Sequence, residues 1–254
     1  MNWLRSLLIV LALLFAGWET MVWWCFPSGS LNYKLSIDVD DNGTVHHGEG
    51  VIKVTYQSNG FLRTPETPLW SVGPVGQAIA VDLGAKGTLF VLLAADPTRV
   101  DRFGIINPTG KPNSAEAGRV ALIEYFNFYF NDLPNDRSGI AIVEDFKAKA
   151  RSAEVRSGDL PMLVRFRDIN DPATIEKVDP SHLDLTFGPG VSIIRSNVEI
   201  TNGPVTSGIE KKLPFWNGPF PWLKPSGTGS SIDTKANEIH FLKQQFDEGT
   251  TGSG

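Results

Sequence analysis

Apolar and polar side chains alternate over two stretches near the start of the chain, with the two-residue period of half-buried β-strands. The sequence "DDNG" lies between them and is typical of a tight turn, so we expect a β-hairpin. Val45 is at an odd position and Ile52 at an even one, so a regular strand would point them to opposite faces. Both can point inward only if a bulge lies between them, and Gly48 and Gly50 are well placed to form it. The apolar positions of the first stretch are Leu31, Tyr33, Leu35, Ile37 and Val39.

The rest of the pattern mixes strands with helices. The periodicity predicts helices over 115–130 and 138–156, and Gly158 is a suitable stop for the second. Two Asp-Pro pairs predict short helical turns at 172–177 and 180–186. Further strands are expected at 77–83, 88–94, 162–168 and 191–200, and a short one near 238–246. Together these elements predict an α+β fold: a single domain with a mainly antiparallel sheet, two longer helices and short helical turns, behind an N-terminal membrane segment.

The N-terminus has the layout of a secretory signal, because Arg5 precedes an uncharged apolar run. Residues 6–26 reach the length of a bilayer span only if they include Glu19 and Thr20, and the tryptophans at positions 18, 23 and 24 suit the headgroup region. We favour an uncleaved anchor over 1–26. Cleavage near Ser28–Ser30 remains the alternative, and would leave a soluble periplasmic protein. Lipidation of Cys25 is disfavoured because Trp24 precedes it.

Composition changes this picture little. The chain has 254 residues, a net charge of −5 and 41% hydrophobic content, which suits one ordinary domain with a sizeable core. There is no basic excess, so we expect no nucleic-acid partner. Cys25 is the only cysteine, which excludes an internal disulfide and a thiolate metal site. No cofactor motif stands out, and we expect none.

Residues 38–49, "DVDDNGTVHHGE", match the pattern of a calcium-binding loop. Such a loop needs an incoming helix, whereas a strand pattern precedes this one, and His46 is a poor ligand for a hard cation. A hairpin with Asp41-Asn42-Gly43 as a three-residue loop explains the same residues. It pairs Asp38 with His46, places Asp38 and Asp40 on a solvated face, and is the interpretation that we favour. The candidate metal ligands are Asp38, Asp40, Asn42, Thr44 and Glu49.

Two other groups of residues are candidates for binding. Arg165 and Arg167 share a strand face and can clamp an anion, although an outward polar face or a pairing with Glu124 also explains them. The aromatic residues Trp216, Phe220 and Trp222 form either a docking surface or a plug over the core. No nucleophile elbow and no triad spacing is present, so we name no catalytic residue.

The segments "LVRFRDINDPATIEKVDP", "FGPGV" and "VEITNGPVTSGIEKKLP" resemble a family of uncharacterised exported proteins of proteobacteria. The resemblance covers about residues 31–223. It implies export and a bacterial source, and it carries no functional residue over to this chain.

We therefore expect an α+β domain over 31–224, held on the periplasmic side of a bacterial inner membrane by residues 6–26, and a flexible tail over 225–254. The leading hypothesis is a non-catalytic module that interacts with an envelope protein or has a structural role. The alternative is a small-ligand binder or an enzyme with a cleft near Arg165, Arg167 and Glu124.

Overall fold

The structure, a computed structural model, describes residues 2–60, 64, 67–93, 122–123, 125–149, 151–215 and 247–248. The chain divides into two compact units. The first comprises Met1–Ser30, Thr55–Val72 and Tyr129–Lys149, and the second comprises Leu31–Val54, Gly73–Phe128 and Ala150–Gly254. Across the described residues the fold consists of mainly antiparallel sheets with few helices, as the sequence pattern predicts.

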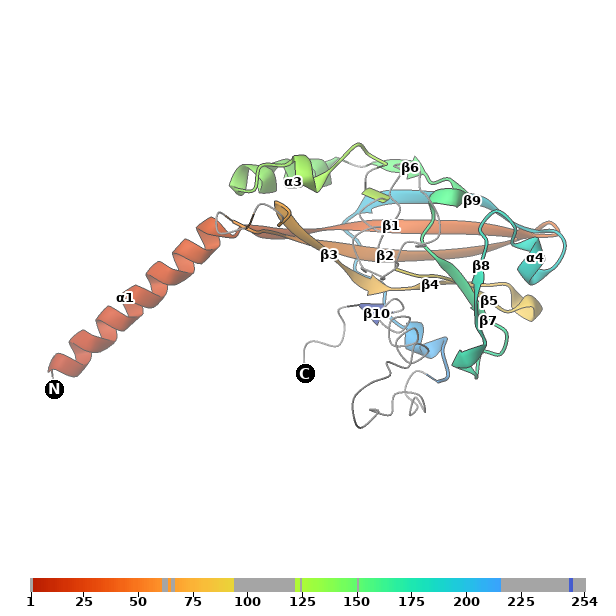
Figure 1. The fold of residues 1–254 in the computed structure, drawn as a ribbon, viewed down its shortest axis with the longest axis horizontal. Helices are drawn as coiled ribbons and strands as arrows, with labels where there is room; N and C mark the ends of the chain where they lie inside the picture. The colour runs from red at the N-terminus through yellow and green to blue at the C-terminus, as the bar shows by residue number, and fades with distance from the viewer. Residues whose placement is uncertain are drawn as a thin grey trace. The chain divides into compact units, whose positions relative to one another are not determined.

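The larger sheet has six strands in the order β10-β3-β2-β1-β9-β6 (Figure 1). β1 pairs antiparallel with β9, and β9 pairs antiparallel with β6. At the other edge, the two-residue β10 pairs with Gln77 and Gly76 of β3. The bounds are β1 Ser28–Asp41, β2 Thr44–Ser58, β3 Trp70–Gln77, β6 Ser152–Glu154, β9 Val191–Thr201 and β10 Asp247–Glu248.

The alternation predicted for β1 is confirmed. Its odd-numbered residues from Leu31 to Val39 are all buried and form the apolar face of the strand. Burial of each such side chain contributes about 2 kcal/mol, so this face fixes which side of the sheet turns toward the core. The even-numbered residues consequently share the opposite face, where the candidate site lies.

The tip of the β1–β2 hairpin corrects two expectations. The turn contains only Asn42 and Gly43, both with positive φ (51° and 90°), as a type I′ turn requires. The predicted three-residue loop is therefore wrong, and Asp38 contacts His47 instead of His46. Val45 is exposed, so β2 alternates regularly and needs no bulge to bring Ile52 inward.

Gly48 and Gly50 instead permit a close approach of the second sheet. A Cβ at Gly48 would lie 2.6 Å from Val81 Cγ2, and one at Gly50 would lie 2.7 Å from Ile79 Cγ1. This sheet has the order β4-β5-β7-β8. Its bounds are β4 Ile79–Asp82, β5 Thr88–Val91, β7 Leu163–Phe166 and β8 Ile175–Val178.

A compact apolar cluster lies against this second sheet. Phe90 of β5 meets Phe166 of β7 edge to face at 5.7 Å, and Phe166 meets Phe215 at 5.2 Å. Ile209 from the turn η6 Ile209–Lys211 and Leu213, two residues after it, belong to the same cluster. The strands predicted at 77–83, 88–94 and 162–168 thus form β4, β5 and β7.

Several predicted helices are shorter or replaced. α3 Arg137–Ala148 begins at its Asp136 cap but stops well before residue 156, because residues 152–154 form β6 and pair with β9. The helix expected at 115–130 lies largely outside the described residues, and Tyr129 is extended, so it does not reach Phe130. The turns at 172–177 and 180–186 become η5 Pro172–Thr174, then β8, then α4 Asp184–Phe187.

The remaining short turns join these elements. η1 Gly84–Lys86 connects β4 to β5, which is the Gly-Ala-Lys-Gly turn of the sequence. η4 Ser157–Asp159 precedes β7. η3 Phe130–Asp132 precedes α3 in the first unit.

The first unit has its own aromatic core. The Tyr56 ring meets Trp70 edge to face at 5.9 Å and Phe130 at 5.2 Å. The Trp70 indole N–H donates to the Leu133 carbonyl at 3.4 Å. Gly139 of α3 lies against this tryptophan: a Cβ there would lie 2.8 Å from its ring and 2.0 Å from the Pro134 carbonyl oxygen. Helix and aromatic cluster therefore approach each other only because residue 139 is glycine.

The same unit contains α1 Asn2–Cys25. Most described apolar side chains of this helix are exposed, among them Leu8, Leu14 and Phe15. The Arg137 guanidinium lies over the Trp24 ring, 5.5 Å from its centroid. Among the described residues, no helix is both long enough and apolar enough to cross a membrane.

Candidate functional site

The register of the larger sheet brings polar residues from four strands onto one face. Three residues of β1 lie directly opposite residues of β9: Lys34 is opposite Glu199, Ser36 is opposite Asn197, and Asp38 is opposite Arg195. Glu154 of β6 lies opposite Asn197 on the other side of β9. His47 and Glu49 come from β2. Side chains two residues apart share a face, so each strand contributes its polar set in one row.

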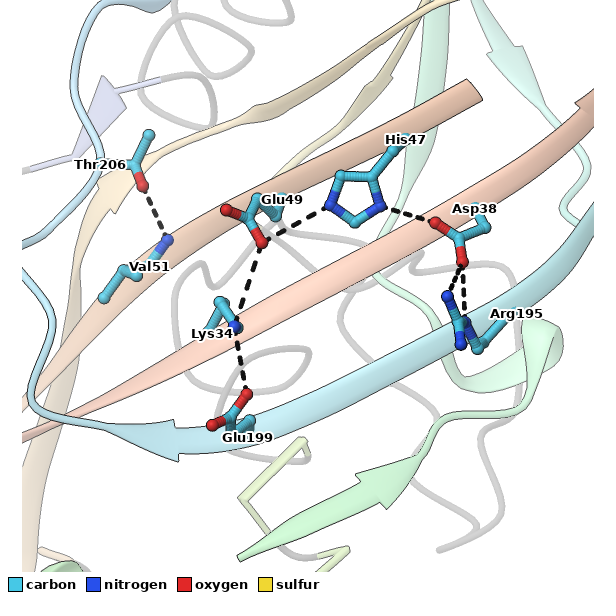
Figure 2. A network of polar contacts seen from close by, with 8 residues as sticks. All are labelled: Lys34, Asp38, His47, Glu49, Val51, Arg195, Glu199 and Thr206. Carbon is cyan, nitrogen blue, oxygen red and sulfur yellow. Dashed lines mark hydrogen bonds and ion pairs between the residues drawn. The ribbon is translucent and has the colours of Figure 1, made fainter. Parts of the chain in front are cut away.

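These side chains line a groove of about 520 Å³, which we call the charged groove. Among the described residues that line it, Ile194 is the one apolar side chain. Figure 2 shows charged side chains of the groove joined in a chain of contacts across β2, β1 and β9. Its carboxylates are Asp38, Glu49, Glu154 and Glu199, and its permanent cations are Lys34 and Arg195.

Asp38 is the buried centre of the charged groove, since the residue is only 5% exposed. Its two oxygens have separate partners. Oδ1 faces His47 Nδ1 at 2.6 Å, and Oδ2 accepts from Arg195 Nε at 2.7 Å and Nη2 at 2.5 Å. The hydrogen bond from His47, followed by those from Arg195, lowers the pKa of Asp38 against the opposing effect of desolvation. The carboxylate is therefore ionised and held at both oxygens.

His47 connects this centre to a second carboxylate. Its other ring nitrogen, Nε2, lies 3.5 Å from Glu49 Oε2. The hydrogen bond with Asp38 raises the pKa of His47 most, and the contact with Glu49 raises it further. At the far end of the groove, Lys34 Nζ lies 3.1 Å from Glu199 and 4.0 Å from Glu49. The network thus ends on ion pairs at both ends.

The middle of the charged groove holds Ser36, Asn197 and Glu154. Within the described residues, no hydrogen bond joins the Ser36 hydroxyl to His47. Among those same residues, no group of three or more His, Cys, Asp or Glu side chains is arranged to hold a metal ion. The described groove is equipped to form hydrogen bonds and ion pairs with a polar partner.

The five candidate metal ligands are divided between the groove and the hairpin tip. Asp38 and Glu49 belong to the charged groove. Asp40 accepts from the Gly43 amide at 3.1 Å, and the Asn42 amide donates to the Pro189 carbonyl at 3.2 Å. Thr44 is exposed where β2 begins. Asp38 is thus a buried member of an ion-pair network, where the hairpin interpretation placed it on a solvated face.

Arg165 lies in the second sheet, and Arg167 follows directly after the end of β7. Arg165 of β7 is directly opposite Glu176 of β8 and forms an ion pair with it, and Arg167 Nε lies 3.6 Å from the other oxygen of Glu176. The Arg165 guanidinium also lies over the Phe187 ring at 5.1 Å. Glu124 lies outside the described residues, as do Trp216, Phe220 and Trp222.

The sequence interpretation named Asp38 and Glu49 but missed the groove that they belong to. Arg195 and Glu199 come from a strand that is distant in sequence, and their relation to β1 depends on register. One usable signal was present. Lys34, Ser36 and Asp38 are spaced by two residues, as are Arg195, Asn197 and Glu199, so each set lies on one face of its strand. Two such polar rows on facing strands indicate complementary pairs, once the pairing of the strands is known.

Comparison of this chain with protein-family models, with curated proteins and with solved structures found no match. The resemblance to exported proteins of proteobacteria therefore stays a prediction. Functional inference rests on the geometry of the chain alone.

Proposed function

We propose that this protein is a membrane-attached module of the bacterial periplasm that recognises an envelope partner without chemical catalysis. In this proposal, α1 is inserted in the inner membrane, although its described residues fall short of a full span, and the charged groove faces the partner. The observation that carries the proposal is the exposure of apolar side chains around the whole circumference of α1.

Five consecutive residues of α1, Leu7 to Leu11, are each between 47% and 60% exposed. Successive residues of an α-helix are about 100° apart, so five in a row cover every direction around the axis. A helix that is apolar all round is stable only when other apolar groups surround it, since each exposed side chain forgoes about 2 kcal/mol of burial. Lipid acyl chains provide that environment.

Charged and aromatic residues support a direction of insertion. Arg5 precedes the apolar run, and positive charges that flank a membrane segment stay on the cytoplasmic side. Trp18 and Trp24 are exposed at the other end of α1, where amphipathic rings prefer the headgroup region. β1 begins a few residues after α1 ends, which supports placing the β-rich remainder on the outer side.

The chemistry of the charged groove favours recognition over catalysis. Its buried carboxylate is neutralised by Arg195 and His47, and its serine hydroxyl has no hydrogen bond to the histidine in the described structure. Paired charges of this kind fix the orientation of a polar partner. The alternative cleft near Arg165 and Arg167 receives less support, because both arginines are paired with Glu176.

Vesicle flotation of the full chain tests membrane attachment. We expect the native chain to float with vesicles and to remain bound after a wash in about 1 M salt, which screens charges beyond about 3 Å. A variant with Leu11→Lys and Leu14→Lys should stay at the bottom of the gradient. Leu185→Lys is the matched control, because Leu185 is an equally apolar residue, 80% exposed, outside α1. Equal flotation of all three proteins, or none by the native chain, contradicts the proposal.

Capture from envelope extracts tests the recognition face. We expect Glu154→Lys, a charge reversal in the groove, to lose at least one partner that native protein retains. Glu210→Lys makes the same charge change outside the groove and should retain that partner. The same partners on both variants would contradict the assignment of the groove as the recognition face.

A further inference from the structure

We propose that His47 is a pH-sensitive link within the charged groove: its imidazolium joins Asp38 to Glu49, and loss of the proton on Nε2 releases Glu49. The inference goes beyond the proposed function and stands on the geometry of the groove, whatever partner binds there.

The two ring nitrogens of His47 each face a carboxylate oxygen. Nδ1 lies 2.6 Å from Asp38, and Nε2 lies 3.5 Å from Glu49. An ionised carboxylate only accepts hydrogen bonds, so each nitrogen must carry a proton to be attracted to its neighbour. A histidine that donates from both nitrogens is the charged imidazolium. The arrangement in Figure 2 therefore favours the protonated ring.

The geometry also indicates which proton is lost first. Asp38 is buried and its bond with Nδ1 is short, so the Nδ1 proton is held firmly. Glu49 is more distant and its side chain is about half exposed, so its contact is weaker. A neutral ring therefore keeps Nδ1–H and presents the lone pair of Nε2 to Glu49. Two acceptors then face each other, and Glu49 turns away.

The charged groups around His47 determine how readily its ring loses a proton. Asp38 and Lys34 face the groove from β1, Arg195 and Glu199 from β9, Glu154 from β6 and Glu49 from its own strand. Arg195 occupies the other oxygen of Asp38 and leaves Oδ1 to His47. The raised pKa of His47, caused first by Asp38, agrees with this geometry.

Deprotonation changes what the groove presents to a partner. The described lining contains four carboxylates and two permanent cations, so these side chains carry one net negative charge while His47 is protonated and two when it is neutral. At the same time Glu49 keeps only its longer contact with Lys34, at 4.0 Å. The groove is therefore more acidic, and has one freer carboxylate, on the alkaline side of the His47 titration.

Nitrogen NMR of ¹⁵N-histidine-labelled full chain in detergent micelles tests this link, with His47→Gln used to assign the signals. We expect both ring nitrogens of His47 to be protonated near pH 6, with a titration midpoint above about 6.5. Asp38→Asn should lower the midpoint by about one pH unit or more, the effect of removing an adjacent opposite charge. Glu49→Gln, at an exposed position that tolerates substitution, should lower it by a few tenths of a unit.

Glu154→Gln is the matched control, since Glu154 lines the same groove but, among the described residues, forms no ion pair or hydrogen bond with His47. It should leave the midpoint within about 0.2 units. If Glu154→Gln shifts the His47 midpoint as strongly as Glu49→Gln does, the midpoint depends on the summed charge of the groove and not on a specific contact with Glu49. One unprotonated ring nitrogen near pH 6, with a midpoint that Glu49→Gln does not move, would overturn the proposal.

Discussion

Two groups of charged residues lie on or next to strands of the second unit, and they differ in burial. In the charged groove, the Asp38 side chain is 7% exposed and is shared by Arg195 and His47. Between β7 and β8, the Glu176 side chain is 33% exposed and is shared by Arg165 and Arg167. Both carboxylates bind two cationic side chains. A buried carboxylate depends on its partners, whereas a half-exposed one can return to water, so burial decides which group is essential.

Replacement of the two carboxylates gives the largest expected contrast. Asp38→Asn should lower the free energy of unfolding by about 2 kcal/mol, because a buried acceptor loses charge-assisted hydrogen bonds on both oxygens. Glu176→Gln should cost less than about 1 kcal/mol, because its partners are partly solvated. Urea unfolding at pH 7 measures both. Equal losses would show that burial does not separate the two groups.

The hairpin turn provides a second test of the charged groove, because the turn fixes the β1–β2 register that brings His47 to Asp38. Gly43 has a φ of 90° and nothing within 4 Å of its Cβ position, so the cost of a side chain there is purely conformational. Gly43→Val should therefore lose about 1–2 kcal/mol. Gly158→Val, also in open space but without positive φ, should change stability by less than about 0.5 kcal/mol. Urea unfolding compares the two, and an equal loss would contradict the two-residue turn.

The pH dependence of stability sharpens the comparison further. The pKa of His47 is raised in the folded state, so its contribution is complete below about 6.5 and is lost as pH rises through the folded value. The pKa of Asp38 is lowered, so its contribution is present above about 3.8 and is lost as pH falls through its folded value. Native protein should exceed His47→Gln in stability by less than about 1 kcal/mol at pH 6, given that the ring is half exposed.

That advantage should shrink by pH 9, when the ring is neutral. Melting temperatures of both proteins at pH 6 and pH 9 provide the measurement. An advantage that grows with pH would reverse the sign that the Asp38 contact requires.

The smallest effect is expected at Arg167. Its side chain is 68% exposed and its contact with Glu176 measures 3.6 Å. Arg167→Gln should change the free energy of unfolding by less than about 0.5 kcal/mol, as for most exposed ion pairs. A loss above about 1 kcal/mol in urea unfolding would mean that the arginine pair is as important as the groove.

Patterns of short range in the sequence predicted much of the fold. The alternation from Leu31 to Val39 predicted β1 and its buried face, and "DNG" predicted the turn, although not its two-residue length. That length determines whether Asp38 meets His46 or His47. The strand β6 was assigned to a helix, because its three residues have no pattern of their own and are ordered by pairing with β9.

The candidate site was less accessible to sequence analysis. Asp38 and Arg195 are distant in sequence and meet because β1 pairs with β9 in one register, interrupted by an irregularity between Asp38 and Val39. No local pattern specifies that register. Glycines at positions 48 and 50 were similarly misinterpreted, since their role appears only when the second sheet lies against β2.

A double-mutant cycle between Asp38 and His47 tests the central claim, that a buried carboxylate and a protonated histidine from adjacent strands form the core of the charged groove. The cycle uses Asp38→Asn, His47→Gln and the double variant, each unfolded by urea at pH 6 and at pH 9. We predict a favourable coupling energy of about 0.5 kcal/mol at pH 6 that falls clearly at pH 9. Coupling near zero at pH 6, or the same coupling at both pH values, would contradict the account.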